Sequence, residues 1–313
     1  MAAPATGLTG DTVTLRVLKG QPGNGVTEVT YEVPGVTGMV VLDAIHNVQH
    51  NLDTDLACRW NCKAAKCGSC SAEVNGRPVL LCKTRIDELP PGPLTVHPLK
   101  TFPLIKDLVT DVSRNFEVNK EIPPFTAEPD DGKPWRIQQV DIDRLYEHRR
   151  CIECFLCQDV CHIMRTHDYA DRFYGPRFFV RVASLEMHPK DTLDRRELTS
   201  GRGGLGYCNI TKCCTEVCPE HIHITDNAII PLKERVADEH WDPMRLMARV
   251  FRERLQNGFA RTKGARPTPA GDLPDPAKPP SNRGPWDDAA LTNVDITEVV
   301  KRQIRTNTRP WEK

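Results

Sequence analysis

Hydrophobic and polar residues alternate along the first part of the chain. Residues 12–18 and 29–33 each place apolar side chains on one side and polar side chains on the other, which predicts half-buried strands. Between them, Gln-Pro-Gly-Asn-Gly at 21–25 indicates a turn, so the two strands are expected to form a hairpin. Apolar residues then recur at helical spacing over 41–48. The pattern therefore predicts a small mixed domain that begins with a hairpin and a helix.

The helical period dominates the following region. It predicts helices over 104–116 and 141–149, and a largely helical segment from 161 to about 199. Gly-Arg-Gly-Gly-Leu-Gly at 201–206 follows no clear strand, so a loop is favoured there over a phosphate-binding turn.

A last helix is expected after Asp242. An aspartate followed by Pro243 is a good helix start, and apolar residues within 244–255 share one face, largely opposite three arginines. Packing against this chain or a partner is the favoured interpretation of that face, and a membrane surface is the alternative. Residues 260–286 are rich in proline, glycine and charge, which predicts a linker, and residues 295–304 fit a short terminal helix.

Composition narrows the choice of function. Lysine plus arginine and aspartate plus glutamate number 42 each, so nothing favours a nucleic-acid partner. The start of the sequence lacks the basic and apolar regions of a signal peptide. No apolar run approaches the roughly 18–20 residues of a membrane span. The thirteen cysteines lie mostly in metal-ligand spacings, which favours thiols bound to iron in a reducing compartment over disulfides.

Two cysteine runs in the second half of the chain share one spacing. Cys151, Cys154, Cys157 and Cys161 form the C-x2-C-x2-C-x3-C run of two-cluster ferredoxins, in which the fourth cysteine binds the other cluster. The second run repeats this spacing and the closing proline at Cys208, Thr211, Cys214 and Cys218.

Threonine at one place of the second run changes the expected chemistry. Iron prefers soft anionic thiolate, so the neutral Thr211 hydroxyl leaves one cluster corner without a ligand. Exchanging the fourth cysteines predicts two sets: a [4Fe–4S] cluster on Cys151, Cys154, Cys157 and Cys218, and a [3Fe–4S] cluster on Cys161, Cys208 and Cys214. Cys213 is an alternative ligand of the second cluster, although Cys214 fits the spacing better. Structural zinc is the other alternative, but three-cysteine runs are awkward for its geometry.

A third group of cysteines lies in the first half. Cys62, Cys67, Cys70 and Cys82 have the spacing of a plant-type [2Fe–2S] site. Gly68 lets the backbone pass close to a cluster, and the turn signal Asn75-Gly76 brings Cys82 back to the loop. Cys58 is outside the motif, and a buried thiol is favoured over a ligand for it.

Patterns and motifs together predict an α+β fold for the 313 residues. We expect an N-terminal β-grasp domain of the plant-type ferredoxin kind over 10–118. An all-α domain resembling two-cluster bacterial ferredoxins is expected over 119–257, followed by an extended tail over 258–313.

Over about residues 12–240 the chain resembles the iron–sulfur subunits of succinate dehydrogenases and fumarate reductases. Besides the cysteines, the resemblance is carried by Val-Leu-Asp-Ala-Ile at 41–45, Cys-Gly-Ser-Cys at 67–70, Leu-Ile-Lys-Asp-Leu-Val at 104–109, Tyr-Gly-Pro at 174–176 and Cys-Pro at 218–219. A non-cysteine at 211 agrees with the [3Fe–4S] site of that family.

The resemblance implies the cofactors and partners of an electron-transfer subunit. In that family a flavoprotein with covalent FAD oxidises succinate, and electrons pass singly through [2Fe–2S], [4Fe–4S] and [3Fe–4S] centres towards quinone at a membrane anchor. It also implies a peripheral position on the cytoplasmic face of the plasma membrane. The chain itself is expected to bind no substrate, and no catalytic side chains stand out.

Three features depart from the family members that reduce quinone beside the [3Fe–4S] cluster. Those members carry proline after the fourth cysteine of the first run, a tryptophan nearby, and histidine after the first cysteine of the second run. At these places this chain has His-Ile-Met-Arg at 162–165 and Asn209. We therefore expect no direct quinone site here, with a haem or a further cluster in the anchor as electron acceptor. The segment Cys-Pro-Glu-His-Ile at 218–222 resembles the actinobacterial type. His162 and His167 are left open between a contact with a cluster or cofactor and a plain surface role.

Two other functions stay open at this point. The same subunit could serve a quinol:fumarate reductase, since the ligands do not set the direction of the reaction. A soluble ferredoxin-like carrier is the alternative of another class, although the two-domain layout and the tail argue against it.

Overall fold

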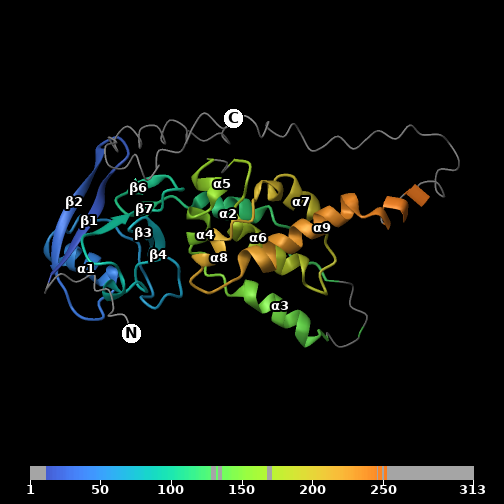
Figure 1. Ribbon diagram of the computed structural model, residues 1–313, viewed down its shortest axis with the longest axis horizontal. Helices are drawn as coiled ribbons and strands as arrows, with labels where there is room; N and C mark the ends of the chain where they lie inside the picture. Colours follow the sequence, from blue (N-terminus) through green and yellow to red (C-terminus); the bar gives the residue numbers. More distant parts are fainter. Residues whose placement is uncertain are drawn as a thin grey trace.

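The computed structural model describes residues 12–127, 132, 136–167, 171–244, 246–248 and 250–251. Figure 1 shows a sheet-containing N-terminal part, in blue and teal, beside a helical C-terminal part in green to orange. The predicted order of a mixed region followed by a helical region is confirmed.

A five-stranded sheet forms the first part, in the order β2-β1-β5-β3-β4. β1 and β2 are the predicted antiparallel hairpin, β5 runs parallel to β1, and β3 pairs antiparallel with both β4 and β5. The strands are β1 (Thr12–Gln21), β2 (Gly25–Pro34), β3 (Ser71–Val74), β4 (Arg77–Leu80) and β5 (Leu94–His97).

One hydrophobic core holds this part together. The helix α1 (Val41–Asn51) buries its apolar face, including Ile45 and Val48, with the inward residues of the sheet. Two residues of the helical part, Phe155 and Leu156, are buried in the same core. The two parts are therefore packed together through apolar contact as well as joined by the chain.

The helix predicted over 104–116 is wrong. The segment forms two short strands, β6 (Leu104–Lys106) and β7 (Val109–Thr110), and helix α2 (Ser113–Lys120) begins only afterwards. The cause is Asp107, a fully buried residue at φ 48° that turns the chain back. Its carboxylate accepts hydrogen bonds of 2.7 Å from the backbone N–H groups of both Gly20 and Ala57. These tertiary contacts override the helical period of the apolar residues.

The helical part packs around a second core, which includes Phe173, Phe178, Phe179 and Leu232. The helix predicted over 141–149 is confirmed as α3, but the segment 161–199 is less helical than expected, because loops separate α5, α6 and α7. The elements are α3 (Gln139–Arg149), α4 (Leu156–Asp159), α5 (His162–Arg165), α6 (Pro176–Glu186), α7 (Arg196–Ser200), η2 (Leu205–Tyr207), α8 (Cys213–Glu216), the π-helical η3 (Ile224–Ile229) and α9 (Ile230–Trp241); a 3-10 turn, η1 (Ile86–Glu88), lies in the first part.

The helix predicted after Asp242 begins as expected. The Asp242 carboxylate accepts a hydrogen bond of 2.8 Å from the backbone N–H of Met244. Its apolar side chains, among them Met247 and Phe251, are exposed. The predicted end of this helix, the tail over 258–313 and the helix over 295–304 lie outside the described residues. Within the described ranges, no helix has the length and apolar character needed to cross a membrane.

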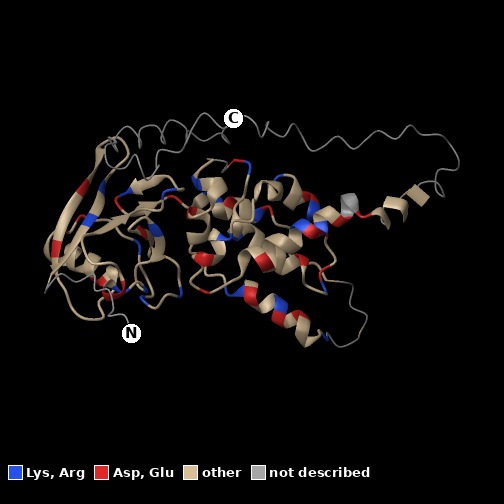
Figure 2. Ribbon diagram, viewed as in Figure 1, with Lys and Arg blue, Asp and Glu red and all other residues tan. Residues whose placement is uncertain are grey.

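Acidic and basic residues are mixed along the elements of both parts (Figure 2). This distribution agrees with the formal net charge of zero.

Candidate iron–sulfur centres

The loop before β3 is shaped by backbone that points its N–H groups at sulfur. Lys63 and Ala65 both lie at φ 56°, which is uncommon for residues with a side chain. As a result, the N–H groups of Ala64 and Lys66 each lie 3.3 Å from the Cys62 sulfur. Hydrogen bonds of this kind stabilise negative charge on a thiolate.

The four predicted cysteines of this loop are brought together. The Cys62 N–H lies 3.5 Å from the Cys67 sulfur, and the Cys82 N–H lies 3.5 Å from the Cys70 sulfur. The N–H of Ala65 lies 3.3 Å from the Cys82 sulfur, which links the distant cysteine to the loop. The β3–β4 hairpin makes this return, as the Asn75-Gly76 turn predicts.

Two thiols of this group differ in electrostatic environment. Burial is the largest influence on the Cys67 thiol and opposes its ionisation, but hydrogen bonds from Ser69 and Cys62 outweigh it and lower the pKa to about 6. Burial raises the pKa of the Cys70 thiol to about 12. Cys70 therefore needs a positively charged partner, such as iron, before it can be a thiolate at neutral pH.

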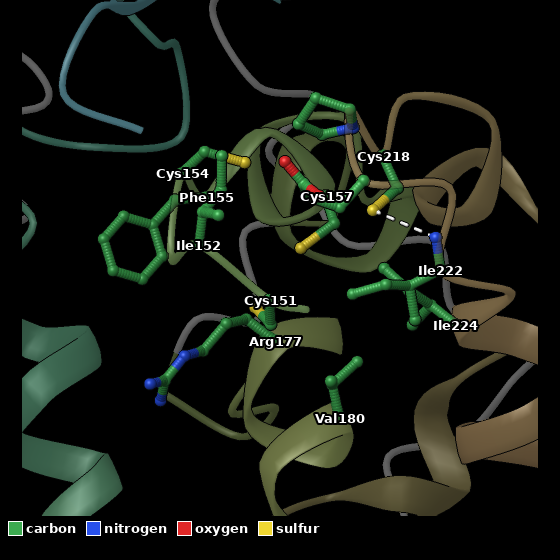
Figure 3. Close-up of a pocket in the computed structure, with 12 residues that line it drawn as sticks. Cys151, Ile152, Cys154, Phe155, Cys157, Arg177, Val180, Cys218, Ile222 and Ile224 are labelled. Atoms are coloured by element: carbon green, nitrogen blue, oxygen red, sulfur yellow. Dashed lines mark hydrogen bonds between the residues drawn. The ribbon is translucent and has the colours of Figure 1, made fainter. Parts of the chain in front are cut away.

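A second group lines one apolar cavity. Cys151, Cys154, Cys157 and Cys218 surround it together with Ile152, Phe155, Val180, Ile222 and Ile224. Figure 3 shows the sulfur atoms of Cys154, Cys157 and Cys218 turned toward a shared space. Cys218 comes from the second run, so the exchange of fourth cysteines expected from the spacing matches the residues gathered here.

Burial raises the pKa of two thiols that line this cavity. Burial raises the pKa of Cys154 to about 12, and burial followed by the neighbouring thiols raises that of Cys157 well above its ordinary value. The N–H of Ile222 lies 3.4 Å from the Cys218 sulfur, marked by the dashed line in Figure 3. Arg177 lines the cavity, but its guanidinium pairs with Glu153 and with Asn119, at 2.7 Å.

A third group lies where the two runs meet. Burial raises the pKa of Cys161 to about 12, and the nearby Cys213 and Cys214 thiols add to the rise. Burial likewise raises the pKa of Cys214 to about 11, with further contributions from Cys213 and Cys208. Cys213 and Cys214 are therefore neighbours of Cys161, and Cys208 is a neighbour of Cys214.

The backbone of the two runs fixes their correspondence. Glu153 and Phe155 in the first run lie at φ 55° and 60°, and Ile210 and Lys212 in the second lie at φ 60° and 64°. Short helices follow directly, α4 from Leu156 and α8 from Cys213. Thr211 thus stands where the first run has Cys154, and Cys213 stands where it has Leu156. This match favours Cys214 over Cys213 as the residue equivalent to Cys157.

One neighbour of the cysteines could not be found from the sequence. The Thr225 hydroxyl lies 3.4 Å from the Cys214 sulfur, and nothing in the sequence pattern marks it. The Thr211 hydroxyl lies 3.3 Å from the Cys213 sulfur. His162, which was singled out, contacts Asn209 at 3.3 Å and stacks edge-on with His167, at 4.8 Å between ring centroids.

Cys58 is only partly buried. It packs against the first core, its sulfur lies 3.6 Å from the Arg59 carbonyl oxygen, and burial raises its pKa to about 12.

Comparison with known proteins places these groups in a family. Residues 14–117 match the family described as 2Fe-2S iron-sulfur cluster binding domain, and residues 147–222 match the 4Fe-4S dicluster domain. The fumarate reductase iron-sulfur subunit of Haemophilus influenzae is 32% identical over 209 residues, which cover 62% of this chain and 80% of that relative. The chain belongs to the iron–sulfur subunit family of succinate dehydrogenases and fumarate reductases.

Further members of this family agree. The succinate dehydrogenase iron-sulfur subunit of Bacillus subtilis is 28% identical over 208 residues, covering 62% of this chain and 81% of the relative. A chain of the Mycobacterium smegmatis Sdh1 complex in the apo form superposes with a TM-score of 0.71 at 55% identity, covering 74% of this chain and 98% of that chain. The family resemblance inferred from the motifs is confirmed.

Proposed function

We propose that this chain is the electron-transfer subunit of a succinate dehydrogenase, which relays electrons singly from a flavoprotein subunit towards quinone. The observation that carries the proposal is the cavity of the second group. Cys218 lines it beside Cys151, Cys154 and Cys157, as expected where two clusters exchange their fourth ligands.

We assign the three clusters to the three groups. Cys62, Cys67, Cys70 and Cys82 hold [2Fe–2S], supported by the N–H contacts that connect their sulfur atoms. Cys151, Cys154, Cys157 and Cys218 hold [4Fe–4S]. Cys161, Cys208 and Cys214 hold [3Fe–4S], supported by the matching backbone of the two runs, which puts Thr211 at the place of a missing ligand.

The fold assignments follow the same division. We propose a β-grasp [2Fe–2S] domain over 10–118, an all-α two-cluster domain over 119–257 and a proline-rich tail over 258–313. The position of Val118 in the second core, together with Ile122, supports a boundary near residue 118.

The donor set and its surroundings fit the proposed clusters. When bound, such clusters supply one-electron chemistry, with potentials set by ligands, hydrogen bonds to sulfur and burial. The chain contributes the thiolates and the N–H groups directed at Cys62, Cys82 and Cys218. Apolar residues such as Val180 and Ile224 line the cavity of the second group and limit its contact with water.

The proposed partners follow from the family. They are an FAD-containing flavoprotein and membrane anchor subunits with quinone and a haem or further cluster. The chain lies on the cytoplasmic face of the plasma membrane, held there by the anchor. The similarity to a chain of the Sdh1 complex supports this assembly over a soluble carrier.

Redox titration tests the direction of the reaction. Relatives that include the Haemophilus influenzae protein are named fumarate reductases, so the same role in a quinol:fumarate reductase is the second candidate. Turnover of the purified complex is measured both ways while the potentials of the three centres are titrated. Faster succinate oxidation supports the first proposal, and faster fumarate reduction supports the second.

A further inference from the structure

The two parts of the molecule touch where two cysteine loops meet. Gly68, next to Cys67, has φ 68°, and a Cβ atom on it would lie 2.8 Å from Cys154 Cα and 2.9 Å from Cys154 Cβ. Contacts below 3.0 Å do not occur for real Cβ atoms, so only glycine lets the loops approach this closely. The residue between two ligands of the first group therefore lies directly on a ligand of the second.

One hydroxyl joins the two loops at this point. Ser71 Oγ lies 2.8 Å from the Gly68 carbonyl oxygen and 2.8 Å from the Cys154 carbonyl oxygen. Ser71 has a single proton, which it shares between the two acceptors. It is also the first residue of β3, which pairs with β4 and β5, so a strand of the sheet sets its position.

A second residue of β3 also contacts the helical part of the molecule. Glu73, on the same face of β3 two residues on, is fully buried and lies 3.0 Å from Arg165 of α5 and 3.2 Å from Lys100. A cavity of about 250 Å³, lined by Arg59, Ser69, Phe116 and Glu153 among others, lies beside the loop contact. The two loops are therefore in direct contact at Gly68 and are joined by the Ser71 hydroxyl, while Glu73 ties the same strand to α5.

We propose that Ser71 is a positioning residue which, with Gly68 beneath it, fixes the separation between the centre bound by Cys67 and Cys70 and the centre bound by Cys154. The inference rests on the proposed function. With clusters bound, passage of an electron from the first centre to the second would exchange no bond or proton. The Gly68 carbonyl, the Ser71 hydroxyl and the Cys154 carbonyl form the shortest hydrogen-bonded link between the two loops that the structure shows.

The test uses the whole purified complex with Ser71→Ala, Ser71→Thr and Gly68→Ala. Gly76→Ala is the matched control for Gly68, because Gly76 also has a positive φ, 75°, but nothing lies within 4 Å of its Cβ position. Ser184→Ala is the control for Ser71, because Ser184 also bonds a carbonyl, that of Arg181 at 2.7 Å, but away from the loops. Iron content, the potential of each centre and the magnetic interaction between the reduced first and second centres are measured by electron paramagnetic resonance.

Ser71→Ala is expected to weaken the magnetic interaction and slow transfer between the two centres several-fold, with iron content and potentials retained. Gly68→Ala is expected to weaken the interaction at least as much, because the added Cβ pushes the loops apart. Ser71→Thr keeps the hydroxyl and is expected to restore both, and the two controls are expected to match the wild type. An unchanged interaction in Ser71→Ala with full iron content would overturn the inference, whatever the folding of Gly68→Ala. If succinate fails to reduce the centres of the wild-type complex, the proposed function is wrong, whatever the result for Ser71→Ala.

Discussion

At the scale of single residues, neighbouring N–H groups and burial determine how readily each cysteine thiol ionises. Backbone N–H groups of Ala64 and Lys66 reach Cys62, and Ala65 reaches Cys82. Buried thiols such as Cys154 and Cys161 have raised pKa values instead, because burial disfavours the thiolate. In the proposed assignment, iron would supply the compensating positive charge at these buried positions.

Cys82→Ser tests the assignment of the first group. We expect it to abolish the [2Fe–2S] signal while leaving the other two centres intact, because serine oxygen is a harder ligand than thiolate. Electron paramagnetic resonance of the reduced complex checks this. Cys58→Ser is the matched control and is expected to keep all three signals. Loss of the [2Fe–2S] signal in the control, with retention in Cys82→Ser, would exchange the roles of the two cysteines.

Thr211→Cys tests the register of the second run. Since Thr211 stands where the first run has Cys154, a thiolate there is expected to convert the three-iron centre to a four-iron centre. The oxidised three-iron signal should disappear and the iron content should rise. Cys213→Ser is the control and should leave the three-iron signal in place. A three-iron signal that persists in Thr211→Cys with an unchanged potential contradicts the register.

At the scale of elements, one arginine fixes the connection between α2 and the helical core. The Arg195 side chain is fully buried and pairs with Asp191 at 2.9 Å. It also donates to the carbonyl oxygens of Pro123 and Pro124, at 3.0 and 2.9 Å. This side chain therefore helps to hold the segment after α2 against the loop between α6 and α7, together with the hydrogen bonds of 2.9 and 3.0 Å from Thr192 to the Thr126 carbonyl oxygen.

Arg195→Ala is expected to destabilise the protein strongly. Removing one partner of a buried ion pair leaves an uncompensated charge and costs about 3–5 kcal/mol. Arg196→Ala removes a more exposed pair with Asp194 and is expected to cost about 0–1 kcal/mol. Thermal unfolding of the two purified variants compares them. Equal unfolding midpoints would show that the buried pair does not hold the connection.

The sequence was a better guide to the cysteine groups than to the elements between them. The spacing within each cysteine run is local, and the two runs repeat the same backbone turns, so the exchange of their fourth cysteines could be expected from a known pattern. The segment 104–116 could not, because its turn at Asp107 depends on Gly20 and Ala57, which are far away in the chain. The bond from Ser71 to the Cys154 carbonyl spans 83 residues and leaves no periodic trace in the sequence.

At the scale of the whole molecule, one buried acidic side chain contacts both parts. Glu73 of the sheet has no exposed surface and faces Lys100, Arg165 and Asp159. A second ion pair between the parts, Lys66 with Glu220 at 3.3 Å, is exposed at the lysine. The two pairs therefore cross the same interface in different surroundings.

Glu73→Ala is expected to loosen the interface, because it removes the buried group that Lys100 and Arg165 both contact, at a cost on the order of 1–3 kcal/mol. Lys66→Ala is the matched control, with an expected cost of about 0–1 kcal/mol. Limited proteolysis and thermal unfolding measure both. A larger effect in the control would mean that the exposed pair, and not Glu73, joins the parts.

The interface should also depend on pH through Glu73. Burial first, and then the negative charge of Asp159, raise the pKa of this carboxyl above its ordinary value of 4.5. A raised pKa means that the folded state favours the proton, so this contribution to stability is full below pH 4.5 and is lost as pH rises through the folded-state pKa. Glu73→Gln should flatten the fall in unfolding midpoint between acid and neutral pH. A fall as steep as in the wild type would contradict this.

Low-temperature electron paramagnetic resonance of the isolated complex, with iron analysis, tests the central claim most directly. The account predicts a three-iron signal in the oxidised state and [2Fe–2S] and [4Fe–4S] signals after reduction. It also predicts an iron content in this chain of one cluster of each kind. An iron-free chain, or an oxidised complex without a three-iron signal and with two four-iron centres, would contradict the assignment of the cysteines.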